Sequence, residues 1–202
     1  MLDRTPGPLG FRTSDLDALP TDGPRYELIE GSVVVSPPPT AAETALTECL
    51  ANMLEVANRG SPLVVDRAQP VRIGEYDEVG PDIVVAHVSM AETTPIPIEA
   101  VALVVEVVSS TSLLRDLTTK HALYASAGVP AYWIVVPNRH PASASVVELR
   151  LDASSGWYVE RTRASSAMFS TDYPWPVTID VSALADAWAA LVLDARRRGE
   201  EV

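Results

Sequence analysis

The segment that most constrains the fold is ALVVEVVSSTS, residues 102–112, in which one acid, Glu106, interrupts an apolar run. A run of aliphatic residues without polar alternation is typical of a strand that is buried on both faces. An unpaired carboxylate in such surroundings costs several kcal/mol even after they relax, so we expect Glu106 to have a partner. The alternative is an edge strand, on which Glu106 would meet solvent or an arginine.

The residues that follow predict a helix and a second buried strand. Ser110-Thr111-Ser112 can cap a helix over 113–127, which Gly128 closes ahead of Pro130. The apolar segment AYWIVVP then predicts the next strand. Two apolar strands joined through a helix are typical of a crossover in an α/β or α+β sheet that helices cover.

The remaining pattern predicts further strands and two long amphipathic helices. YELIE and SVVVS flank Glu30-Gly31, an arrangement typical of a hairpin with a tight turn. Apolar residues at helical spacing predict one helix over 40–58 and another over 182–198. The other predicted strands are PLVVD, QPVRI, PDIVVAHV, SVVELRL and GWYVERT.

Length and composition fit one globular domain. The chain has 202 residues, of which 47% are hydrophobic and 21% charged, and we expect a flexible lead-in over 1–12 and a single domain over 13–198. The only cysteine, Cys49, excludes an intramolecular disulfide. No apolar segment is long enough for a membrane span or a signal core, so we expect a cytoplasmic protein. The formal charge of -12 opposes nonspecific binding of polyanions, although carboxylates that hold a metal belong to the same count.

Two acids stand where neighbouring strands would bring them together. Asp82 follows Pro81 at the start of PDIVVAHV, and Glu106 lies in the next long strand. If these strands are neighbours, the two carboxylates lie at one end of the sheet and repel each other unless a cation or proton lies between them. Mg²⁺ suits such a place, because it binds one or two carboxylates together with water and substrate phosphate. The alternative for Asp82 is a turn cap after Pro81.

The helix after Glu106 presents three polar residues on one face. Asp116, Lys120 and Tyr124 recur every four residues, whereas His121 points about 100° away. If this face meets the end of the sheet, Lys120 reaches the pocket of Glu106, where it can hold a water or neutralise charge on a phosphate. The same spacing also fits an ordinary exposed ion pair between Asp116 and Lys120.

Glu27, in the hairpin segment YELIE, is a third acid, which either faces solvent on an edge or joins the other two. Other catalytic patterns are missing from the sequence. His87, His121 and His140 have no metal-ligand spacing, and no glycines frame a serine of SSTS as a nucleophile elbow. A glycine-rich phosphate loop is also missing.

Three segments carry a family resemblance: RYELIEGSVVVSPPPT, GPDIVVA and LVVEVVSSTSLLRDLTTKHALYASAGVPAYWIVVP. In this order they resemble the Uma-two family of restriction endonucleases, within the PD-(D/E)XK nuclease superfamily. The resemblance runs from residue 15 to residue 193 and is most specific over 103–136. It implies a restriction-endonuclease-like fold of the α/β (α+β mixed) class, with a mixed central sheet flanked by helices.

The resemblance also implies roles for individual residues. Asp82 and Glu106 would bind Mg²⁺ or Mn²⁺, and Lys120 would assist the water that hydrolyses a DNA phosphodiester. Asp116 would position Lys120, and Tyr124 would line the pocket. The chain would then be a metal-dependent DNA endonuclease.

The chain departs from the family pattern at two places. The superfamily's lysine stands two residues after the glutamate, where this chain has Val108, so its role passes to Lys120. Many family members have a histidine shortly after the Ser-Pro-Pro turn (36–38), and this chain has none there. Glu27 matches the acid of the family's Tyr-Glu-Leu segment and would assist the metal.

Two functions of different classes remain open. The set of Asp82, Glu106 and Lys120 favours a nuclease that acts on DNA. The charge of -12 and the absent histidine favour a non-catalytic nuclease-fold protein, a binding or assembly module that retains a weak metal site. A homodimer is plausible, because a small cleft alone supplies little basic surface.

Overall fold

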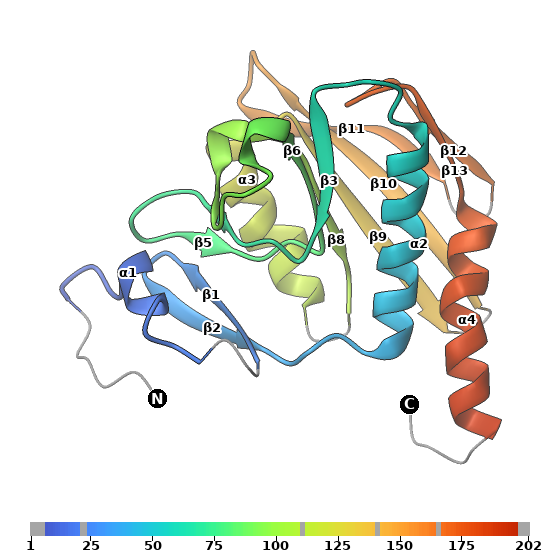
Figure 1. The fold of residues 1–202 in the computed structure, drawn as a ribbon, viewed down its shortest axis with the longest axis horizontal. Coiled ribbons are helices and arrows are strands. Elements are labelled where there is room, and N and C mark those ends of the chain that lie inside the picture. The colour runs from blue at the N-terminus through green and yellow to red at the C-terminus, as the bar shows by residue number, and fades with distance from the viewer. Residues whose placement is uncertain (1–6, 21–23, 110–111, 140–141, 165–166, 198–202) are drawn as a thin grey trace.

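The computed structural model describes residues 7–20, 24–109, 112–139, 142–164 and 167–197. The chain contains both strands and helices, as expected for a mixed α/β fold, and many of the strands follow one another directly (Figure 1). In chain order the elements are α1 (Thr13–Leu16), β1 (Arg25–Ile29), β2 (Ser32–Ser36), α2 (Ala41–Ala57), β3 (Leu63–Arg67), β4 (Val71–Arg72), β5 (Glu78–Val79), β6 (Ile83–His87), η1 (Val88–Met90), β7 (Ile96–Pro97), η2 (Ile98–Ala100), β8 (Val101–Val107), η3 (Arg115–Lys120), α3 (His121–Ser126), β9 (Ala131–Arg139), β10 (Ala142–Asp152), β11 (Trp157–Ala164), β12 (Met168–Thr171), β13 (Val177–Asp180) and α4 (Val181–Arg197).

A six-stranded mixed sheet forms the centre of the molecule, in the order β11-β10-β9-β8-β6-β3. β8 and β9 are parallel, which confirms the predicted crossover through a helix, and the other neighbours are antiparallel. β8 has a neighbour on each side. The strand of Glu106 is therefore interior, and the alternative of an edge-strand acid is wrong.

Helices α2 and α4 lie side by side over one face of this sheet (Figure 1). Thr40 is the N-cap of α2. Its side chain accepts a hydrogen bond from the Glu43 amide, and the Glu43 carboxylate accepts one from the Thr40 amide, which together form a capping box. The apolar stripes of both helices pack on alternate residues of the strands, such as Val105 on β8 and Trp133 on β9. Trp133 meets Phe169 of β12 edge to face, with ring centroids 4.9 Å apart.

A second apolar core covers the opposite face of the sheet and was not apparent from the sequence. It joins Val104 of β8, Val108 just after β8 and Tyr124 of α3 to a five-stranded sheet in the order β2-β1-β5-β4-β7. β4, β5 and β7 have two residues each, too few to show a period of two. The predicted strand QPVRI is therefore shortened to β4, and the hairpin of β12 and β13 was also missed.

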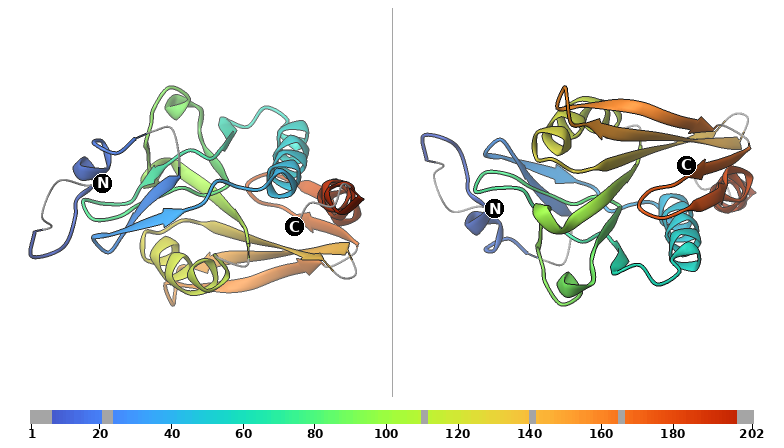
Figure 2. Two further views of the ribbon diagram at one scale, coloured as in Figure 1. Left: turned by 90° about the horizontal axis from the view of Figure 1, so that it is seen from below. Right: turned by 90° about the horizontal axis from the view of Figure 1, so that it is seen from above.

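The predicted hairpin is confirmed as β1 and β2, paired from Arg25 opposite Ser36 to Ile29 opposite Ser32. Its two turn residues, at 30 and 31, both have positive φ, 48° and 72°, as a tight turn of this kind requires. Of the expected lead-in, residues 7–12 pack on this turn, and residues 1–6 lie outside the described residues. The N-terminal segment and α4 lie at opposite ends of the molecule (Figure 2). Within the described ranges, no helix is both long and apolar enough to cross a bilayer.

Candidate metal and phosphodiester site

Asp82 and Glu106 meet at one end of the central sheet. β6 and β8 are antiparallel neighbours with Ile83 opposite Val105, so Asp82, just ahead of β6, lies beside the end of β8 that carries Glu106. The backbone amide of Val107 donates a 2.8 Å hydrogen bond to Oδ2 of Asp82. The side chain of Asp82 therefore turns towards β8, as the strand pattern predicted.

Lys120 reaches the same place from the helix that follows β8. The predicted helix over 113–127 is present, but residues 115–120 are wound as the π-helix η3, a winding often found at functional sites. The ammonium nitrogen of Lys120 lies 2.8 Å from Oε1 of Glu106 and 3.8 Å from Oδ1 of Asp116. Lys120 and Asp116 are 2% and 1% exposed, so the alternative of an ordinary surface ion pair is wrong.

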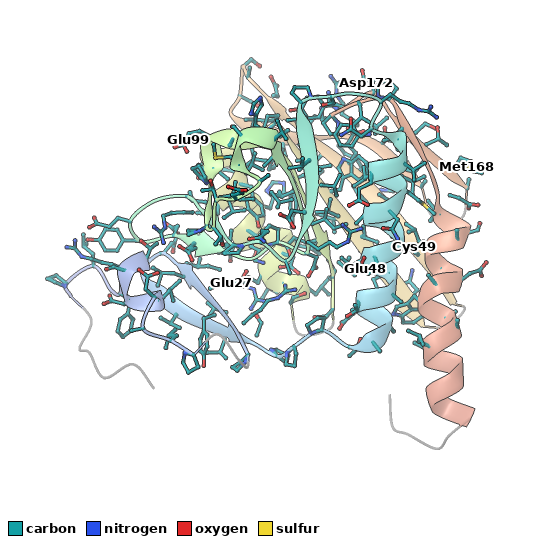
Figure 3. All side chains as sticks on the ribbon, viewed as in Figure 1. Glu27, Glu48, Cys49, Glu99, Met168 and Asp172 are labelled. Atoms are coloured by element: carbon teal, nitrogen blue, oxygen red, sulfur yellow. The ribbon has the colours of Figure 1, made fainter. Side chains whose placement is uncertain are left out.

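Glu27 completes the group from the N-terminal hairpin. Its Oε1 lies 2.7 Å from the Lys120 nitrogen and accepts a 2.9 Å hydrogen bond from the Gly80 amide. The side chain is almost fully buried and lies towards the middle of the molecule (Figure 3). Of the two placements that the sequence left open for Glu27, the structure shows the one beside the other acids.

Tyr124 was expected to line the cleft. It lies behind Glu106 instead and is not among the lining residues. Its hydroxyl donates a 2.9 Å hydrogen bond to the same Oε1 of Glu106 that contacts Lys120, and its side chain is fully buried. Both donors end on Oε1, so Oε2 is the oxygen of Glu106 that takes a hydrogen bond from neither of them.

The acids open onto a cleft of about 260 Å³ between the hairpin, the start of α2 and η3. Five carboxylates and three cations line it, so the cleft is acidic overall. The lining residues are Arg25, Glu27, Ser36, Pro37, Pro38, Pro39, Thr40, Glu43, Gly80, Asp82, Glu106, Val107, Ser109, Ser112, Arg115, Asp116 and Lys120.

Two arginines of this cleft were missed from the sequence. Arg25 lies 3.1 Å from Oδ1 of Asp82, and the guanidinium of Arg115 lies 3.7 Å from Oε2 of Glu27 and donates to the Ser36 hydroxyl at 3.1 Å. Arg25 stands two residues before Glu27, which puts both on one face of a strand, and this spacing is the one signal that could have found it. Arg115 is adjacent to a buried acid, but nothing in the local pattern distinguishes it.

The burial of so many charges shifts their pKa values. Burial, together with Asp82, Asp116 and Glu27, raises the pKa of Glu106 to about 8 although Lys120 opposes the rise. Burial alone would lower the pKa of Lys120, but Glu106, Glu27 and Asp116 outweigh it and raise that pKa above its usual value. Burial would raise the pKa of Glu27, yet Lys120 and the Gly80 amide hold it below the usual value. Lys120 is therefore charged at neutral pH.

Asp116 carries an unsatisfied oxygen. Burial raises the pKa of this carboxyl, and within the described residues its Oδ1 has no hydrogen-bond partner, since Lys120 at 3.8 Å is beyond hydrogen-bond distance. Its backbone carbonyl accepts a 3.0 Å hydrogen bond from the Tyr132 hydroxyl, which ties η3 to β9. The structure thus leaves one buried acceptor of Asp116 without a hydrogen bond beside Lys120.

The donor set suits Mg²⁺ or Mn²⁺ bound together with a substrate. Within the described residues, no three imidazole, thiolate or carboxylate groups are placed to hold a metal ion by themselves. Mg²⁺ seldom uses such a cage and is held by one or two carboxylates, with water and substrate phosphate as the other ligands. Asp82 and Glu106, which line one cleft, fit this requirement.

Neither of the two described histidines, His87 and His121, lines the cleft. His121 packs edge to face on Tyr132 and Tyr158, with ring centroids 6.5 Å and 5.2 Å away, and His87 is exposed at the end of β6. His140 lies outside the described residues. Behind the Ser-Pro-Pro turn, where the resemblance led us to look for a histidine, the cleft is lined by Thr40 and Glu43.

Comparison with known proteins supports the resemblance seen in the sequence. The model of the Uma2 family, described as "Putative restriction endonuclease", matches residues 13–166. The fold is similar to the crystal structure of "a putative nuclease belonging to DUF820" from Anabaena variabilis ATCC 29413, with a TM-score of 0.65 and 16% identity over 88% of this chain and 99% of that chain. No protein with a curated description matches the chain. The family model spans well over half of the sequence, and the chain therefore belongs to the Uma2 family.

Proposed function

We propose that this protein is a metal-dependent endonuclease that hydrolyses phosphodiester bonds in DNA. The observation that carries the proposal is the convergence of Asp82, Glu106 and Lys120 on one cleft, from two adjacent strands and the helix that follows. Membership of a restriction-endonuclease family and a fold similar to that of a nuclease support the same class of reaction.

Asp82 and Glu106 would hold Mg²⁺ or Mn²⁺, with Oε2 of Glu106 directed to the ion because Oε1 is engaged by Lys120 and Tyr124. When bound, the ion supplies a Lewis acid for the phosphodiester and lowers the pKa of a bound water. The chain itself fixes the carboxylates. The Val107 amide orients Asp82, and the Tyr124 hydroxyl orients Glu106.

Lys120 would stabilise the negative charge that develops on the phosphate during attack. Its ammonium group is held by Glu27 and Glu106, at 2.7 Å and 2.8 Å, and Asp116 lies on its third side. Such a group is pre-oriented, so little reorganisation is needed when charge develops beside it. We assign Glu27 and Asp116 as positioning residues for Lys120.

The test is cleavage of single-stranded, duplex and flapped DNA, with Mg²⁺, Mn²⁺ or EDTA. We expect cleavage by the wild type only with metal, and a loss of at least about a hundredfold in Glu106→Gln and in Lys120→Met. Glu148→Gln is the matched control, because Glu148 is an equally buried acid, paired with Arg150 and outside the cleft lining. Equal rates in the wild type and Glu106→Gln would refute the proposal.

A binding or assembly role is the second candidate, and the charge distribution favours it. Carboxylates outnumber cations in the cleft, and the whole chain has a formal charge of -12, so a polyanion meets repulsion until metal binds. A protein of this kind would bind Mn²⁺ in calorimetry but leave every DNA form intact. Metal-dependent cleavage that Glu106→Gln abolishes would exclude it.

A further inference from the structure

Arg25 is paired with Asp82, one of the two carboxylates that would hold the metal. One of its guanidinium nitrogens lies 3.1 Å from Oδ1 of Asp82 and 3.3 Å from the carbonyl oxygen of Gly80. The other carboxylate oxygen of Asp82 accepts the Val107 amide at 2.8 Å. Both oxygens of Asp82 therefore have donors, and only the bond to Arg25 can be released without moving a strand.

Arg25 is also the most exposed of the three cations that line the cleft. Its side chain is 31% exposed, whereas that of Lys120 is 3% exposed and surrounded by carboxylates. A guanidinium binds the oxygens of a phosphate in a planar, bidentate way that suits a phosphodiester. Arg25 thus has two anionic partners within its reach, the carboxylate of Asp82 and any phosphate that enters the cleft.

A divalent ion on Asp82 and the guanidinium of Arg25 compete for one oxygen. Two cations on the same carboxylate repel each other, so metal binding weakens the ion pair of Arg25 with Asp82. A guanidinium released in this way would remain in the cleft, where it could bind a substrate phosphate. In the free protein, the same ion pair would lower the affinity of Asp82 for the metal.

We propose that Arg25 is a substrate-binding residue that exchanges Asp82 for the DNA phosphate when the metal binds, and so couples metal and DNA affinity. The inference rests on the proposed metal site. By linkage, DNA that draws Arg25 away from Asp82 strengthens metal binding by the same factor by which metal strengthens DNA binding. Removal of Arg25 should therefore strengthen metal binding and weaken DNA binding. Removal of a residue with a purely structural role would not produce these opposite effects.

Arg115 provides a contrast within the same cleft. It also carries one positive charge, but its guanidinium faces Glu27 and Ser36 rather than Asp82. Loss of its charge can change the electrostatic potential of the cleft, but it frees no oxygen of Asp82. Arg115→Gln is therefore the matched control for Arg25→Gln.

The experiment is calorimetric titration of Mn²⁺ into the DNA-free protein, followed by DNA binding with Ca²⁺ measured by anisotropy of a labelled oligonucleotide. For Arg25→Gln we expect the Mn²⁺ Kd to fall about fivefold, the equivalent of about 1 kcal/mol, and the DNA Kd to rise about tenfold. Arg115→Gln should weaken DNA binding with less than about a twofold change in the Mn²⁺ Kd. Arg25→Lys, which keeps the charge beside Asp82, should keep the Mn²⁺ Kd of the wild type within about twofold.

The outcomes separate this inference from the proposed function. A wild type that binds no Mn²⁺ overturns the metal site and the inference together. Mn²⁺ binding that is equal or weaker in Arg25→Gln, or tightened equally in Arg25→Lys or Arg115→Gln, overturns the role of Arg25 and leaves the metal site in place. If Arg25→Gln does not fold by circular dichroism, Arg25→Met, which keeps the aliphatic length, takes the same test.

Discussion

The ammonium group of Lys120 lies 2.8 Å from Oε1 of Glu106, and the two side chains are only 3% and 4% exposed. Lys120 is also the only lysine in the sequence. Its ammonium nitrogen also lies 2.7 Å from Oε1 of Glu27, so a single buried lysine pairs with more than one buried acid. The stability of this part of the molecule therefore depends on one residue.

Replacement of Lys120 by Met should destabilise the protein by about 3–5 kcal/mol at neutral pH, because it leaves buried carboxylates without a counter-ion. The loss of stability should be smaller at acidic pH, because these carboxylates are then protonated. Urea unfolding of both proteins at several pH values measures it. A second substitution, Glu27→Gln, should recover part of the loss in Lys120→Met, because Lys120 holds the pKa of Glu27 below its usual value and that carboxylate is left charged without it. A double mutant that is no more stable than the single one would contradict the charge argument.

Chemical labelling offers an independent test of the burial of Lys120. A reagent such as acetic anhydride modifies exposed amines, and this chain has only the N-terminal amine and Lys120. In the folded protein, mass spectrometry should find the N-terminal amine modified and Lys120 protected, because Lys120 is 2% exposed and its pKa is raised by the surrounding acids. In urea both amines should react. Equal reactivity before and after unfolding would place Lys120 at the surface.

The sequence predicted the central strands and the helices well, because each has a distinct pattern. The apolar runs on either side of the crossover helix identified two buried parallel strands, and the position of Glu106 in one of them identified the site. The spacing of Asp116, Lys120 and Tyr124 put the right face of the helix towards the sheet, although a π-helical winding was not foreseen. The pairing of β6 with β8 was assumed, and the structure confirms it.

The missed features depend on contacts between segments that are distant in sequence. The five-stranded sheet uses strands of two residues, which acquire their conformation from their neighbours rather than from a local pattern. Arg115 enters the cleft because η3 packs against the hairpin, a relationship that no local spacing encodes. The roles of the site residues in metal binding and hydrolysis stay predictions.

Two glycines with the same backbone angle test how the N-terminal segment packs. Gly31 and Gly156 both have φ of 72°, but an added Cβ at Gly31 would collide with the backbone of residues 9 and 10, whereas nothing lies within 4 Å at Gly156. Gly156→Ala should cost about 1 kcal/mol for the left-handed backbone alone. Gly31→Ala should cost more, because the N-terminal segment must also move away. Thermal unfolding of the two variants compares them directly, and equal losses would mean that residues 7–12 do not pack on the hairpin turn in solution.

The raised pKa of Glu106 predicts how the stability of the metal-free protein depends on pH. This carboxyl has a pKa of about 8 in the folded protein and an ordinary value of 4.5, so between these values the folded state binds more protons than the unfolded state. The contribution of Glu106 to stability is therefore fully present below pH 4.5, its pKa in the unfolded protein. It is lost as the pH rises through about 8, its pKa in the folded protein. The free energy of unfolding should therefore fall from about pH 5 to pH 8, and Glu106→Gln should flatten this slope.

Mn²⁺ should oppose the fall, because an ion that binds the ionised carboxylate displaces its proton. Urea unfolding at each pH, with EDTA or with Mn²⁺, measures both effects, and a slope that is equal in the wild type and Glu106→Gln would show that Glu106 does not titrate in this range.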